Sequence, residues 1–88
     1  MFVILYYDVS SKRCGKMLKT CRKYLQWVQN SVFEGELSEA GYEKMVLELR
    51  KIIKTEDDDS IVVYKFRQMK YYDRLVYGTD KKGDNQFI

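Results

Sequence analysis

Residues 2–9, with the sequence FVILYYDV, form a near-continuous apolar run that contains one acid, Asp8. Such a run is typical of a strand buried on both faces, so we expect it to lie in the centre of a sheet. Ser10 and Ser11 follow, and their hydroxyl groups are suited to capping a helix. The sequence therefore begins with a central strand and a helix, with Asp8 near the carboxyl end of the strand.

The predicted first helix carries positive charge without nearby acids. Between residues 9 and 33 there is no Asp or Glu, while the cations are Lys12, Arg13, Lys16, Lys19, Arg22 and Lys23. At about 100° per residue, the apolar side chains share one face and four lysines cluster near the opposite pole. The apolar set is Cys14, Met17, Leu18, Cys21, Leu25 and Val28, which extends the predicted helix to residue 28.

A second helix and three further strands are predicted after residue 28. Residues 29–37, QNSVFEGEL, read as one strand, and Ser38 can cap a helix whose apolar positions continue to Ile53. Residues 60–67 and 74–77 read as two more strands. This order gives two successive right-handed crossovers, whereas a break of residues 29–37 into a hairpin would give a split β-α-β arrangement. In either case both helices cover one face of a four-stranded sheet, and the aromatic residues on the other face need a partner.

The composition limits the chemistry. The 88 residues suffice for one small domain, which is marginal alone and would gain from dimerisation. The chain has no histidine, which excludes Ser-His and Cys-His nucleophiles and His-ligated zinc. Any metal must then be a hard cation held by oxygen. The net charge of +3 is modest, but residues 34–59 hold nine acids against four cations while the first third is basic, and this asymmetry suggests a polyanion on one face.

The cysteines and the apolar segments indicate a cytoplasmic protein. Cys14 and Cys21 would lie about 10.5 Å apart along a helix, too far for a disulfide, so we expect reduced thiols. The first apolar run lacks a basic start and ends in an aspartate, unlike a secretory signal. No segment is long and apolar enough to span a membrane, so no membrane partner is expected.

Asp8 and the basic helix each allow two interpretations. Asp8 can hold a divalent metal, or it can simply accept hydrogen bonds from the following turn. One carboxylate binds Mg²⁺ poorly, but a two-fold dimer would bring two Asp8 side chains together. The lysines can form an ordinary solvated face or bind phosphates, and the second reading explains why the helix accepts repulsion between like charges.

Several segments resemble the CRISPR-associated protein two family. They are YYDV at residues 6–9, Lys12-Arg13, QNSVFEGEL at 29–37 and DSIVVY at 59–64. The resemblance covers nearly the whole chain. It implies an α+β, ferredoxin-like sandwich with two helices on one face of a four-stranded, mainly antiparallel sheet. It also implies a homodimer formed through the sheets, with residues 1–78 as the domain and residues 79–88 as a tail or strand that crosses to the partner subunit.

The resemblance further implies a role in CRISPR adaptation, beside an integrase subunit, as a metal-dependent endonuclease acting on RNA or DNA. Asp8 from each subunit would be the catalytic and metal-binding residue for Mg²⁺ or Mn²⁺. The residues expected to bind nucleic acid are Lys12, Arg13, Lys16, Lys19 and Arg22, and those expected to support the site are Tyr7, Ser10 and Phe33. One departure is Trp27, which stands where many relatives carry an arginine. The alternative is a non-catalytic bridge between integrase dimers that holds protospacer DNA; a single-stranded RNA-binding domain of similar topology is disfavoured because its glycine-containing aromatic motif is missing.

Overall fold

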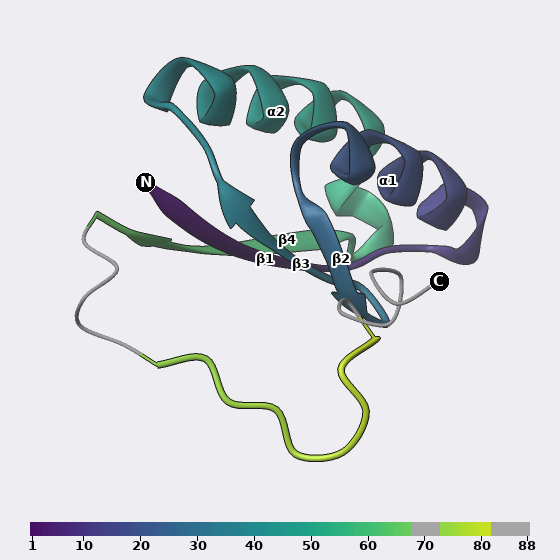
Figure 1. Cartoon of the computed structure of the whole chain (residues 1–88). Helices are drawn as coiled ribbons and strands as arrows, with labels where there is room; N and C mark the ends of the chain where they lie inside the picture. The colour runs from purple at the N-terminus through teal and green to yellow at the C-terminus, as the bar shows by residue number, and fades with distance from the viewer. Residues whose placement is uncertain (68–72, 82–88) are drawn as a thin grey trace.

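The β1 strand, Phe2–Asp8, lies inside a four-stranded antiparallel sheet in the computed structural model, which describes residues 1–67 and 73–81. The strands run in the order β2-β3-β1-β4, and both helices cover one face of the sheet (Figure 1). The other elements are α1 (Ser11–Tyr24), β2 (Gln26–Gln29), β3 (Val32–Glu36), α2 (Glu39–Ile52), a 3₁₀ turn (Thr55–Asp57) and β4 (Ser60–Phe66). The predicted α+β sandwich is confirmed.

The predicted central position of β1 is also confirmed. It pairs with β3 on one side and with β4 on the other, and Leu5 lies opposite both Phe33 and Val63. Val3 and Leu5 are fully buried beneath the helices. Because side chains alternate along a strand, Tyr6 and Asp8 lie on the opposite face, which we call the open face.

The prediction of one strand over residues 29–37 was wrong, and the hairpin alternative is correct. The first helix ends at Tyr24 instead of residue 28, because Leu25 turns into extended backbone and its N–H bonds to the Cys21 carbonyl. Val28 therefore belongs to β2, and the chain reverses at residues 30–31, where Asn30 adopts a positive φ of 48°. The result is the split β-α-β-β-α-β order.

Both helices begin at the predicted caps. The Ser10 side chain accepts a hydrogen bond from the Lys12 N–H, and Ser38 accepts one from the Gly41 N–H. The helices bury one stripe each against the sheet and enclose a single core. The fully buried core side chains are Phe33, Leu5, Met17, Met45, Leu49, Val3 and Cys21. Cys14, which the periodicity placed on the apolar face, is exposed.

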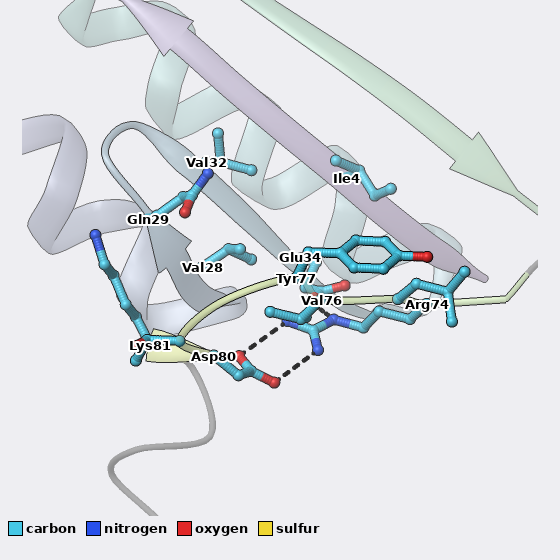
Figure 2. Close-up of a pocket in the computed structure, with 12 residues that line it drawn as sticks. Ile4, Val28, Gln29, Val32, Glu34, Arg74, Val76, Tyr77, Asp80 and Lys81 are labelled. Atoms are coloured by element: carbon cyan, nitrogen blue, oxygen red, sulfur yellow. Dashed lines mark hydrogen bonds and ion pairs between the residues drawn. The ribbon is translucent and has the colours of Figure 1, made fainter.

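The prediction of a strand at residues 74–77 was also wrong. These residues form no ladder; instead they cross below the open face, where Arg74 pairs with Glu34 and Asp80 (Figure 2). They enclose a pocket of about 300 Å³ with β2 and β3. Leu75 and Tyr77 remain 71% and 89% exposed. Most of the tail predicted to cross to a partner lies outside the described residues, which end at 81. No helix among the described residues is long and apolar enough to cross a membrane.

Candidate functional site

Asp8 is the last residue of β1 and its side chain is exposed on the open face. It lies opposite Ser60, the first residue of β4. Among residues 1–67 and 73–81, no side chain or backbone group forms a hydrogen bond or ion pair with the Asp8 carboxylate. The carboxylate is therefore presented to solvent at the end of the central strand β1, where it can accept an external ligand.

The chemistry of this carboxylate fits a hard divalent cation only in part. Carboxylate oxygen suits Mg²⁺, which usually takes one or two protein carboxylates together with waters and substrate phosphates. The described residues contain no cluster of three or more His, Cys, Asp or Glu side chains that could hold a metal. One chain thus supplies a single protein ligand, Asp8, and a complete site needs oxygen atoms from elsewhere.

A buried ion pair holds the two segments next to Asp8 together. The Arg13 guanidinium of α1 lies 2.5 Å from the Asp59 carboxylate, which is fully buried and directly precedes β4. The same carboxylate accepts hydrogen bonds from the backbone N–H groups of Ser10 and Lys54, each at 2.9 Å. The hydrogen bond from Arg13, with help from these N–H groups, holds the pKa of Asp59 well below its usual range. Asp59 therefore fixes the turn that follows Asp8.

The structure places Arg13 differently from its expected role in binding nucleic acid. Arg13 is 8% exposed, and its second donor is taken by Asp57 at 2.9 Å. Its charge is therefore compensated inside the protein by Asp57 and Asp59. Asp59 was missed by the sequence analysis because the pairing joins residues 46 apart in the chain. The run of acids at residues 56–59 reads as a solvated loop when only the sequence is considered.

The other predicted cations of α1 do form an exposed basic surface. Lys12, Lys16, Lys19 and Arg22 are exposed, and none forms an ion pair with any described residue. Lys12 and Lys16 line a groove of about 370 Å³ together with Lys51 and Lys54. Lys51 and Lys54 lie at and just beyond the end of α2, in the acid-rich part of the sequence, so the charge pattern did not reveal them. Lys23 instead pairs with Glu48 of α2.

The three residues predicted to support the site lie on the helix side of the sheet or in the turn after β1, and none forms a hydrogen bond with the Asp8 carboxylate. Tyr7 is buried on the helix side of β1 and stacks on Phe33, with ring centroids 6.1 Å apart. Burial, more than any other cause, raises the pKa of Tyr7. Ser10 caps α1. Tyr7 and Phe33 thus form the apolar floor beneath the end of β1, while Ser10 anchors the turn beyond it.

Comparison with known proteins identifies the class to which this fold and site belong. The family model described as "CRISPR associated protein Cas2" matches residues 1–74. The chain belongs to the Cas2 family.

Curated relatives and a solved structure agree with this assignment over most or all of the chain. A protein from Dictyoglomus turgidum named "CRISPR-associated endoribonuclease Cas2" is 44% identical over all of both chains. A protein of the same name from Thermotoga maritima is 48% identical over the whole of this chain and 99% of its own. A crystal structure described as Cas2 superimposes with a TM-score of 0.81 at 44% identity, covering 92% of this chain and 90% of that one.

Proposed function

We propose that this protein is a metal-dependent endonuclease that cleaves RNA phosphodiesters, and that it serves in CRISPR adaptation. The observation that carries the proposal is the exposed Asp8 carboxylate, which stands at the end of the buried strand β1 and is followed by α1, a helix that carries exposed cations and no acid. A carboxylate and a set of unpaired cations are the two features that metal-assisted phosphodiester cleavage requires. The printed names of relatives at 44% and 48% identity support the reaction class.

The incomplete metal site supports a homodimer. An isologous interface across the open face would bring a second Asp8 to the same metal. The open face suits such an interface because Tyr6 and Tyr64 stack there with ring centroids 6.3 Å apart, yet remain 39% and 53% exposed. Exposed aromatic and aliphatic side chains gathered on one face are characteristic of an interaction surface. The apolar stretch at residues 75–77 is exposed on the same side and extends this surface.

Within such a site, the chain's own residues would have distinct roles. Asp8 would hold Mg²⁺ or Mn²⁺, which when bound would polarise the scissile phosphate and provide an acidic water. Lys12 and Lys16 would bind the flanking phosphates and set the position of the backbone. Arg13 and Asp59 would fix the turn after Asp8, so that the carboxylate keeps its direction. Histidine has no part in the proposal because the sequence contains none.

The experiment that tests the proposal is a cleavage assay on end-labelled single-stranded RNA and on duplex DNA, with Mg²⁺, with Mn²⁺ and with a chelator. Asp8→Asn should lower the rate by about a hundredfold or more, because the metal loses a ligand. Glu43→Gln is the matched control, since it neutralises an exposed carboxylate on α2. Cleavage that is unaffected by Asp8→Asn or by the chelator would reject the proposal.

A second candidate function is a non-catalytic bridge that holds protospacer DNA between integrase dimers. The observation in its favour is the extent of the basic surface, which combines four unpaired cations of α1 with Lys51 and Lys54. In this case DNA binding and integration in a reconstituted system depend on Lys16 and are indifferent to Asp8→Asn. Asp8→Asn therefore separates the two candidates, because it should abolish cleavage under the first and leave integration unchanged under the second.

A further inference from the structure

A groove of about 370 Å³ lies between α1, along residues 14–22, and the β2–β3 hairpin, and it is separate from the lysine-lined groove. Its main lining residues are Tyr7, Cys14, Leu18, Arg22, Trp27 and Ser31. Small-ligand pockets usually span roughly 300–1,000 Å³, so this groove has room for one compact ligand. None of the residues assigned above to metal binding or phosphate positioning, apart from Arg22, lines it.

The indole of Trp27 is fixed before any ligand arrives. Its Nε1–H donates a hydrogen bond of 3.0 Å to the Asn30 carbonyl in the hairpin turn. Its backbone lies opposite Phe33, and its side chain packs against the hydrophobic core. An aromatic ring that is already held in place loses little conformational entropy when a planar ligand stacks on it.

The charge of the groove selects an anion. All its lining residues fall between positions 7 and 31, and no carboxylate is among them. Arg22 is exposed and has no ion pair with any described residue. A fixed aromatic ring beside an unpaired guanidinium, in a region without acids, is the combination by which proteins bind single-stranded nucleic acids: bases stack on the ring and the backbone lies along the cations.

We propose that this groove binds one unpaired nucleotide of a single-stranded nucleic acid, with its base stacked on Trp27 and its phosphate on Arg22. The inference rests on the proposed function and gives it a base-binding subsite. Tyr7 lines the groove and immediately precedes Asp8, so a strand seated there leads to the end of β1.

The single tryptophan makes the groove directly observable, because Trp27 is the only source of indole fluorescence. The probe is a short single-stranded oligonucleotide, as RNA and as DNA of the same sequence, titrated with a chelator present to prevent cleavage. An abasic oligonucleotide of equal length retains the phosphates and lacks the bases. We expect the base-bearing strands to quench Trp27 and to bind about tenfold more tightly than the abasic strand, which is the gain expected from one stacked base.

Variants distinguish a loss of base stacking on Trp27 from a loss of the fold. Trp27→Phe should keep most of this gain, and Trp27→Leu should lose it. Since Trp27 also packs on the core, a second pair of variants uses Gly15, which lines the groove and where an added Cβ atom meets no atom within 4 Å. Gly15→Gln should weaken binding of base-bearing strands and reduce quenching, whereas Gly15→Ala should leave both unchanged.

The outcomes distinguish this inference from the proposed function. If base-bearing and abasic strands bind equally and neither quenches Trp27, the nucleotide subsite is rejected while nucleic-acid binding stands. If no strand binds at all, both the proposed function and the subsite are rejected. If free nucleotides quench Trp27 but base-bearing strands bind no more tightly than the abasic strand, the groove is a small-molecule site and the inference is rejected.

Discussion

Arg13 Nε lies 2.5 Å from the Asp59 carboxylate, so a buried ion pair links the first turn of α1 to the residue that precedes β4. Asp8 lies between these two points, since the Ser10 backbone N–H donates a hydrogen bond to the Asp59 carboxylate on one side and Ser60 pairs with Asp8 on the other. The direction of the Asp8 carboxylate therefore depends on a pair that does not contact a ligand. We therefore propose that Asp59 and Arg13 act as positioning residues for Asp8.

Replacing Asp59 by Asn should destabilise the fold and impair cleavage. Asn leaves Arg13 buried without its main counter-charge, and uncompensated buried charges are strongly destabilising. We expect the Tm to fall by roughly 10 °C, measured by circular dichroism. The carboxylate of the exposed neighbour Asp58 forms no ion pair or hydrogen bond with the described residues, and its positive φ of 62° is one that Asn tolerates well, so Asp58→Asn is the control. Equal Tm values for the two variants would contradict the role given to Asp59.

The same carboxylate predicts how stability depends on pH. Its folded pKa lies below its unfolded value, which is about 3.9, so the unfolded state binds the proton more readily as the pH falls. The stabilisation is present above about pH 4 and is lost as the pH falls toward the lower folded pKa. We expect the difference in Tm between wild type and Asp59→Asn to be constant near neutral pH and to shrink below about pH 4. A Tm difference between wild type and Asp59→Asn that grows as the pH falls would contradict this prediction.

Cys21 predicts a loss of stability at alkaline pH. Burial raises the pKa of its thiol to about 12, whereas an unfolded cysteine ionises near about 8.5. Between these values the unfolded state is favoured by releasing the proton, so stability falls as the pH rises. Cys21→Val should remove this slope between about pH 8 and 10, as followed by thermal melts. Cys14 is exposed, so Cys14→Val should leave the slope as it is in the wild type.

Reversing the charge of Lys16 should weaken nucleic-acid binding and lower its dependence on salt. Each phosphate contact contributes about one unit to the slope of log K against log salt, so Lys16→Glu should reduce that slope by about one or more. Lys44 is an exposed lysine of α2 and lines none of the grooves described above, which makes Lys44→Glu the control for net charge. An identical effect of the two reversals in a fluorescence anisotropy titration would show that overall charge, and not the α1 surface, governs binding.

The sequence predicts those parts of the fold that depend on local patterns. The unbroken apolar run of β1 indicates a central strand, and Ser10 and Ser38 mark the helix starts because capping is a short-range interaction. The end of α1 was misplaced because Leu25 and Val28 continue the helical periodicity, although Leu25 is extended in the structure. Residues 74–77 have the composition of a strand, but the described residues pair Arg74 with Glu34 instead of building a ladder.

The site is less accessible to sequence reasoning because its contacts join distant positions. Asp8 stands out by its place at the end of β1. The ion pair between Arg13 and Asp59 joins α1 to the residue before β4. The groove that Lys12 shares with Lys51 and Lys54 forms where α1 and the end of α2 pack side by side. In the sequence, Trp27 was notable only because the resemblance implied an arginine at that position. In the structure it lies in a groove with Arg22, which is the basis of the proposed nucleotide subsite.

The most direct test of the central claim is a subunit-mixing experiment with wild type and Asp8→Asn. The two are denatured together, refolded at varied ratios and assayed for Mg²⁺-dependent cleavage of single-stranded RNA. If one metal is held by Asp8 of both subunits, activity falls with the square of the wild-type fraction, and pure Asp8→Asn is about a hundredfold less active or worse. A linear fall would contradict the shared site, and full activity of pure Asp8→Asn would contradict the catalytic role of Asp8 altogether.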